Sequence, residues 1–286
     1  MTKISELLAA GPTYSVEFMP PRSDEMLRQL EKTLRELEPV APSFGSVTYG
    51  AGGSTRDRTF EAVLHVHHDT AIPAMPHLTC VGQTRAEIDG LVRSYANEGI
   101  ENLLALAGDP PKDGAVAGDF KFAVELIALA RDVADFSIGV AAFPEVHPNS
   151  PDRDEDRRRL AEKLKLADFA ITQFFWSAEH YFRLVDDMAA LHCDTPIIPS
   201  VFLMLNGAAA ERYTRVNGAE WPPWLAARVE HAGGDAAELQ RIGVDVGTSI
   251  GQQLLDAGVP GLHLYTLNRS ASTLEVWHNL GLSARR

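Results

Sequence analysis

Short apolar segments recur along the chain, each bounded by proline, glycine or polar residues. They are apolar on both faces, which is typical of parallel strands covered by helices. Eight have the length of a strand: Tyr14 to Phe18, Phe44 to Tyr49, Met75 to Thr79, Leu103 to Leu106, Ser137 to Phe143, Phe169 to Phe174, Pro196 to Phe202, and Gly261 to Leu267. The pattern therefore predicts a buried parallel sheet.

Segments with helical periodicity separate these strands, for example Glu25 to Leu37, Arg85 to Glu98 and Phe122 to Val133. Alternating strands and helices favour parallel pairing. Eight such units close into a barrel of roughly 250 residues, whereas an open doubly wound sheet more often has about five or six strands. We therefore expect an α/β fold, a single-domain (β/α)8 TIM barrel over residues 1–286.

The interval before the last strand, from Phe202 to Gly261, is longer than the others. It contains helix-like stretches at Ala208 to Val216 and Gly247 to Ala257, so we expect an extra helical segment there. Long loops on barrels usually serve the active site. The chain ends soon after the eighth unit, and no regulatory domain is expected.

The charge balance narrows the class of partner. The formal net charge is -13, which argues against a nucleic-acid partner. No apolar run approaches the roughly 20 residues that span a bilayer, and the first residues do not resemble a signal peptide. With only two cysteines, in unrelated contexts, we expect a cytoplasmic enzyme that binds a small molecule and no membrane. The sequence leaves homo-oligomerisation open.

Polar residues stand where the predicted strands end, and in a barrel these positions face the active site. Any one of them alone is as readily explained as a loop cap or a satisfied hydrogen-bond partner. Their recurrence around the barrel instead favours one shared polar cup. Its expected members are Glu17, Thr48, His77, Asp109, Glu145, His147, Gln173, Asn268 and Arg269.

Two carboxyl groups in this set suggest acid chemistry. Glu17 follows Val16 on an apolar strand, so desolvation should raise its pKa and allow it to donate a proton near neutral pH. Asp109, if ionised, would stabilise a developing cation. The alternative for Asp109 is an Asx turn before Pro110.

Two other sequence patterns are weaker indications of a functional site. The glycine-rich stretch 50–55 fits neither the Rossmann fingerprint nor the P-loop, and we interpret it as a tight turn between strand and helix. His65, His67 and His68 fall in a helix-like stretch where only His65 and His68 share a face. We interpret them as a solvated or core face and expect no metal site.

Six blocks at the predicted strand ends together resemble methylenetetrahydrofolate reductases. They are Glu17-Phe18-Met19-Pro20-Pro21-Arg22, Ser46-Val47-Thr48-Tyr49-Gly50, Pro76-His77-Leu78-Thr79-Cys80, Pro144-Glu145-Val146-His147-Pro148, Ile171-Thr172-Gln173-Phe174-Phe175, and Tyr265-Thr266-Leu267-Asn268-Arg269. The match spans nearly the whole chain, and the blocks occur in order.

The resemblance implies reduction of 5,10-methylenetetrahydrofolate to 5-methyltetrahydrofolate, with FAD relaying hydride from NADH or NADPH. Glu17 matches the family's catalytic acid, which opens the folate's five-membered ring to an iminium. Asp109 matches a residue that contacts the pterin and supports that cation. Gln173 matches a folate hydrogen-bonding residue, and Tyr213 an aromatic position that stacks on folate or nicotinamide.

The remaining candidates follow from the same strand ends and blocks, except Lys163, which matches the family in the helix after the fifth strand. We expect Asn268 and Arg269 to contribute to substrate binding. We expect cofactor binding by Thr48, His77, Phe143, His147 and Lys163.

Departures from the family concern the flavin. Ala107 stands where the family usually has an arginine that holds FAD, Phe143 replaces a tyrosine that bonds flavin, and Glu162 replaces a basic contact. A carboxylate beside a diphosphate repels it. Ala209 also replaces a glutamine near the substrate. We therefore expect weak or absent FAD, with hydride passing directly from NADH or NADPH to the folate.

Two alternatives remain open. The first is a FAD-dependent ping-pong reductase of the same family, with other loop residues compensating. The second is a folate-binding barrel without turnover, although such a module would have no need of a desolvated carboxyl group, which costs stability.

Overall fold

The computed structural model describes residues 2–49, 56–80, 82–108 and 118–282. All pairings between its strands are parallel. The strands are β1 (Thr13–Phe18), β2 (Gly45–Val47), β3 (Ala74–Thr79), β4 (Asn102–Leu106), β5 (Ser137–Ala142), β6 (Phe169–Thr172), β7 (Ile197–Ile198), β8 (Ser200–Phe202) and β9 (Gly261–Tyr265). Each lies within a residue or two of a predicted strand.

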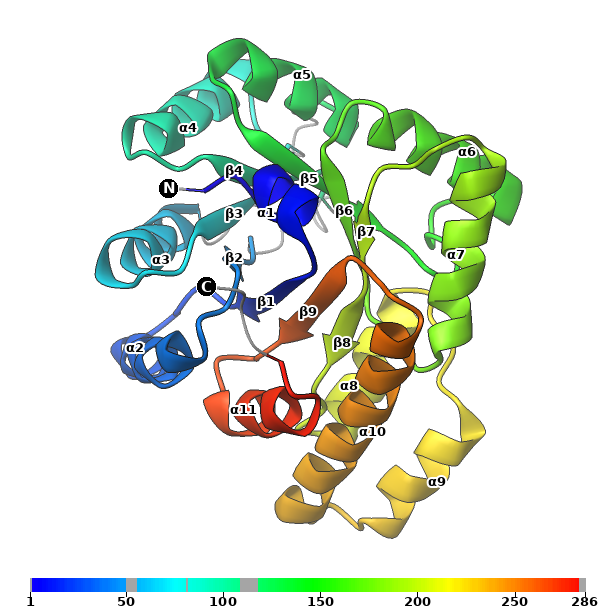
Figure 1. The fold of residues 1–286 in the computed structure, drawn as a ribbon. Helices are drawn as coiled ribbons and strands as arrows, with labels where there is room; N and C mark the ends of the chain where they lie inside the picture. Colours follow the sequence, from blue (N-terminus) through cyan, green and yellow to red (C-terminus); the bar gives the residue numbers. More distant parts are fainter. Residues whose placement is uncertain (1, 50–55, 81, 109–117, 283–286) are drawn as a thin grey trace.

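The strands follow one another in the order β7-β6-β5-β4-β3-β2-β1-β9-β8 and form a nearly closed barrel (Figure 1). β7 and β8 are two parts of one predicted strand, interrupted at Pro199, which has no backbone N–H for the ladder. β7 pairs with β6, and β8 pairs with β9 on the other side. The predicted eight-unit barrel is therefore confirmed, with its seventh strand in two pieces.

Helices surround this barrel (Figure 1). They are α1 (Ile4–Ala10), α2 (Asp24–Leu37), α3 (Arg56–Asp69), α4 (Arg85–Asn97), α5 (Ala123–Val133), α6 (Arg153–Leu164), α7 (Ala178–Ala190), α8 (Gly207–Val216), α9 (Pro223–His231), α10 (Ala236–Asp256) and α11 (Ser270–Asn279), with a short 3-10 helix at Glu38–Val40. No helix in the described part of the chain combines the length and apolar character needed to cross a bilayer.

The extra helical segment before the last strand is larger than the sequence indicated. It holds α8, α9 and α10, and α10 starts at Ala236 rather than near Gly247. Asp235 caps its first turn by accepting hydrogen bonds from the backbone N–H groups of Ala237 and Glu238. The apolar positions Leu239, Ile242 and Val246 already follow the three- and four-residue spacing of a helix, so this start was predictable from the sequence and was missed.

The barrel interior is apolar at the end where the strands begin. Phe44, Met75, Leu104, Phe169, Ile171 and Ile198 form one buried cluster there together with Ile4 of α1. Gly139 belongs to this packing, because a Cβ at that position would lie 2.5 Å from the Phe169 ring.

Helix α1 closes this end of the barrel (Figure 1). Its first backbone N–H groups are satisfied by strand side chains, since Ile4 donates to Asn102 Oδ1 at 2.8 Å and Ser5 donates to Ser137 Oγ at 3.0 Å. Satisfying these otherwise unpaired donors fixes the helix over the barrel floor. Only the opposite end, where the strands finish, is left to hold a site.

Candidate active site

Glu17 points into the barrel from the carboxyl end of β1. Its Oε2 lies 3.6 Å from His77 Nε2 on β3 and 3.5 Å from His263 Nε2 on β9. The Glu17 side chain is 16% exposed, so the carboxyl group is buried yet reachable from the mouth. Burial raises the pKa of Glu17 from 4.5 to about 7, although nearby His77 opposes part of that rise.

The two histidines beside Glu17 are neutral at neutral pH. Burial lowers the pKa of His77 to about 4, with Glu17 opposing the shift and His263 adding to it. Burial alone lowers the pKa of His263 to about 3. Neither ring therefore brings the positive charge that would hold Glu17 as a carboxylate, and a proton donor is available near pH 7.

A loop after β9 fixes the backbone at the end of β1. Thr266 Oγ1 donates to the Glu17 carbonyl at 2.6 Å, and the Asn268 amide bonds both the N–H and the carbonyl of Met19 at 2.9 Å. Leu267 and Asn268 have φ of 50° and 55°, a left-handed turn that directs the amide back to β1. In the described structure Asn268 is buried and holds the loop that follows the acid.

Other predicted residues lie on the opposite part of the rim. Phe143 and His147 stack edge to face with ring centroids 4.4 Å apart. Gln173 accepts a 3.4 Å hydrogen bond from the Asn217 amide, and Phe143, Gln173 and Asn217 line one small hollow. The structure therefore brings Phe143, His147 and Gln173 together, across the barrel mouth from β1.

The remaining predicted ligands lie further out. Tyr213 on α8 is 43% exposed, with the Arg212 guanidinium 5.2 Å from its ring centroid. Arg269 is exposed at the start of α11, 3.5 Å from Gln29. Thr48 is half-buried and accepts a hydrogen bond from Thr59 through its carbonyl. None of these three side chains hydrogen-bonds or ion-pairs with Glu17, so the role of each stays a prediction.

The basic residues of α6 are held by the protein itself. Lys163 Nζ donates to the Ala141 carbonyl at 2.6 Å, and burial lowers its pKa to about 8. Arg157 is 4% exposed, and its five N–H donors are all occupied. Its partners are the carbonyls of Phe143, Pro144 and Glu145 and the carboxylates of Asp156 and Asp187.

Sequence reasoning did not single out His263 or Ser15. His263 is completely buried, and Ser15 Oγ lies 2.8 Å from its Nδ1. The signal was strand parity, because Ser15 shares the inward face of β1 with Glu17, and His263 shares that of β9 with Tyr265. A polar residue at an inward position between apolar neighbours marks such a cluster.

Two sequence patterns fall elsewhere. Asp109 and the glycine-rich stretch 50–55 lie outside the described residues. His65 and His68 bond the carboxylates of Asp69 and Glu98, while His67 is buried. Among the described residues, no group of three His, Cys, Asp or Glu side chains is arranged to hold a metal ion.

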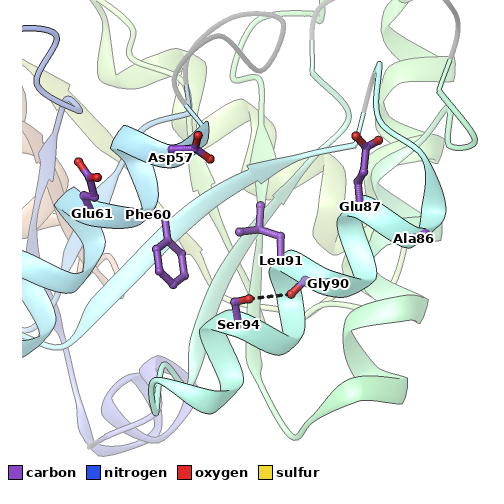
Figure 2. A pocket seen from close by; sticks show the side chains of 8 residues that line it. All are labelled: Asp57, Phe60, Glu61, Ala86, Glu87, Gly90, Leu91 and Ser94. Atoms are coloured by element: carbon purple, nitrogen blue, oxygen red, sulfur yellow. Dashed lines mark hydrogen bonds between the residues drawn. The ribbon is translucent and has the colours of Figure 1, made fainter.

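A groove of about 490 Å³ lies on the helical layer, away from this cluster. Figure 2 shows Phe60 of α3 and Leu91 of α4 facing it, with Asp57, Glu61 and Glu87 around them. Its lining residues all belong to these two helices and none to a strand. The groove is therefore distinct from the strand-end site that contains Glu17.

Comparison with known proteins agrees with this geometry. A family model described as methylenetetrahydrofolate reductase matches residues 3–281. Relatives named 5,10-methylenetetrahydrofolate reductase, from Salmonella typhimurium and Escherichia coli, are each 36% identical over 270 residues, 94% of this chain and 90% of theirs. A rice protein named probable methylenetetrahydrofolate reductase (NADH) is 33% identical over 98% of this chain and 50% of its own length.

A solved structure shares the fold. It is a Clostridium thermocellum protein, described as binding two copies of 5-methyl-5,6,7,8-tetrahydrofolic acid, with a TM-score of 0.70 over 98% of both chains. At 13% identity this likeness concerns architecture alone. The family model and the curated relatives, which cover nearly the whole sequence, show that the chain belongs to the methylenetetrahydrofolate reductase family.

Proposed function

We propose that this protein reduces 5,10-methylenetetrahydrofolate to 5-methyltetrahydrofolate, taking hydride directly from NADH or NADPH. The observation that carries the proposal is Glu17, a carboxyl group with a pKa raised to about 7 at the open end of the barrel. A general acid works best when its pKa lies near the working pH. Family membership supports the folate substrate, and the name of the rice relative favours NADH for that protein.

The proposed chemistry needs one proton and one hydride. Glu17 gives its proton to one nitrogen of the folate's five-membered ring, the bond from that nitrogen to the bridging carbon breaks, and the other nitrogen forms an iminium with that carbon. Hydride from the nicotinamide then adds to the carbon and gives the methyl group. Direct transfer requires both substrates in the mouth at once.

The mouth suits flat ligands. Phe174, Phe202 and Tyr265 form an aromatic group beside the Glu17 cluster, with Phe174 and Phe202 stacked at 4.6 Å. Phe143 adds a half-buried ring on the rim. The buried Phe174 and Phe202 rings exclude water beside the site, whereas the partly exposed Tyr265 and Phe143 rings can stack on pterin or nicotinamide.

The described residues do not fit a FAD diphosphate at α6. Arg157 has no free donor, and Lys163 commits one of its three donors to the Ala141 carbonyl, while burial lowers its pKa to about 8. Glu162 is exposed on the same helix and would repel phosphate. Phe143 has no hydroxyl to offer a flavin. These contacts support the flavin-independent route.

The test is steady-state oxidation of NADH and NADPH with methylenetetrahydrofolate, on purified protein with and without added FAD. We expect turnover that FAD does not change, intersecting double-reciprocal lines, and a loss of about a hundredfold or more in kcat for Glu17→Gln. Glu275→Gln, an exposed carboxyl change on α11, is the matched control and should behave as wild type.

Two outcomes would replace the proposal by its alternatives. A stoichiometric flavin absorption band with parallel double-reciprocal lines would identify the ping-pong flavoenzyme of the same family. Tight folate binding without oxidation of either nucleotide would identify a binding barrel.

A further inference from the structure

His263 lies beneath Glu17 and is fixed on every side. Its Nδ1 is 2.8 Å from Ser15 Oγ and its Nε2 is 3.3 Å from Ser46 Oγ. The Phe44 ring stacks on the imidazole at 5.9 Å with an interplanar angle of 19°. The ring cannot turn without breaking these contacts, so the nitrogen that faces Glu17 is always Nε2.

The hydrogen atoms of this group have one arrangement in which each finds an acceptor. Ser15 Oγ lies 3.3 Å from the Leu262 carbonyl, which can only accept. If Ser15 donates there, His263 Nδ1 carries the imidazole hydrogen and donates to Ser15 Oγ. Ser46 then donates to the lone pair on Nε2.

The opposite tautomer satisfies fewer groups. With the hydrogen on Nε2, His263 would donate to Ser46, and the Ser46 hydroxyl hydrogen would have no acceptor among the described residues. Ser15 would have to give up the Leu262 carbonyl to donate to Nδ1. Buried polar hydrogens without acceptors are costly, so the first arrangement is favoured.

We infer that His263 is a positioning residue: Ser15 and Ser46 hold it with Nδ1 protonated, and its unprotonated Nε2, 3.5 Å from Glu17 Oε2, keeps Glu17 in the acid form. The Nε2 lone pair already accepts from Ser46, so this nitrogen offers the Glu17 carboxylate no hydrogen-bond donor and repels its negative charge. A carboxylate that faces a lone pair in place of a donor is disfavoured, which favours the acid form. The role in turnover rests on the proposed function, whereas the protonation of Glu17 does not.

The other groups facing Glu17 bring no cation. His77 on β3 lies 3.6 Å away and is neutral because burial lowers its pKa. Tyr265 on β9 is neutral because burial, and to a lesser extent Glu17, raises its pKa. Among the described residues, Glu17 is thus surrounded by neutral partners. The tautomer of His263 decides whether its Nε2 presents a hydrogen or a lone pair to Glu17.

The first measurement is long-range 1H–15N correlation NMR on histidine-labelled wild-type protein near pH 7, with the His263 signals assigned from His263→Gln. We expect a protonated Nδ1 and an unprotonated Nε2. An Nε2–H tautomer, or a charged ring, would overturn the inference. No substrate is present, so a failure of the proposed activity does not affect the result.

The second measurement follows the Glu17 carboxyl band by infrared difference spectroscopy against Glu17→Gln. His263→Asn keeps a polar group near the position of Nδ1 but leaves nothing at the position of Nε2. It should lower the pH midpoint of the Glu17 titration by about one unit. His263→Gln places an amide oxygen near Nε2 and should restore most of the shift. An unchanged or raised midpoint in His263→Asn would contradict the inference.

Activity supplies the last readout. One unit of pKa should reduce kcat/KM of His263→Asn about tenfold near pH 8 and change it little near pH 5.5, where the acid is protonated in both proteins. A merely structural defect would lower both values equally. Ser137→Ala, which removes a buried strand hydroxyl at the closed end of the barrel, is the control and should leave the profile unchanged.

Discussion

The two ends of the barrel interior are built from different side chains. The closed end is filled by Phe44, Met75, Phe169 and their apolar neighbours, under α1. The open end holds Glu17, His77 and His263 with their polar atoms a few ångströms apart, and the Glu17 side chain remains 16% exposed. The apolar packing at the closed end stabilises the fold by removing apolar area from water. Burial of the Glu17 carboxyl group at the open end is unfavourable for folding but keeps a proton on that group.

We therefore expect the stability and the activity of this barrel to depend on different ends of its interior. Changes at the closed end should reduce the free energy of unfolding without altering the chemistry of each folded molecule. Replacing the Glu17 carboxyl group at the open end should reduce activity and leave stability unchanged or higher, whereas Asn268, which holds the backbone there, should contribute to stability. The substitutions below test this division in order of expected effect.

Phe169→Ala should cost about 4 kcal/mol of unfolding free energy, because it leaves a large cavity beside Gly139 and Phe44. Urea unfolding measures the loss, and kcat per folded molecule should stay within about twofold of wild type. A drop in kcat without loss of stability would show that the two ends of the interior are not separate.

Glu17→Gln should stabilise the protein at alkaline pH. The folded-state pKa of about 7 lies above the ordinary 4.5, so protonation favours the folded state fully below pH 4.5, and this contribution is lost as pH rises through 7. Removing the titration should raise the unfolding free energy by about 3 kcal/mol near pH 9 relative to wild type.

Near pH 4 the same substitution should change stability little, because both side chains are then neutral. Chemical denaturation at the two pH values gives the difference directly. A Glu17→Gln protein equally or less stable than wild type near pH 9 would mean that the carboxylate is not destabilised in the folded barrel.

Asn268→Ala should cost about 2 kcal/mol, because it leaves the N–H and carbonyl of Met19 unpaired and places alanine at a φ of 55°. Asn268→Gly relieves the backbone strain but not the lost amide, so it should recover about half of the loss. Full recovery by glycine would assign the effect to the turn alone, and thermal unfolding of the two variants separates these cases.

The sequence predicted the barrel and the position of its acid, because both depend on local patterns. Apolar runs and helical periodicity placed the eight units, and Glu17 stood at a strand end among apolar neighbours. The division of one strand at Pro199 depends on a single residue, whose effect periodicity does not resolve.

Side-chain destinations were harder to predict. Lys163 and Asn268 are polar residues at positions that match the family, yet the structure bonds them to backbone groups of Ala141 and Met19. Which partner a long or amide side chain finds depends on tertiary distances that a linear pattern does not contain. His263 was missed because its importance comes from β1 and β2, more than two hundred residues away along the chain.

Strand β9 is bonded to β1 on one side and β8 on the other, and it also carries His263. During synthesis on the ribosome, residues 13–18 must therefore wait until residues 261–265 have been made before they gain this neighbour. Until then, Glu17 has only part of its enclosure and should titrate like an ordinary surface glutamate. We therefore expect Glu17 to gain its raised pKa only when β9 joins the barrel, so that an incomplete nascent chain lacks this proton donor near neutral pH.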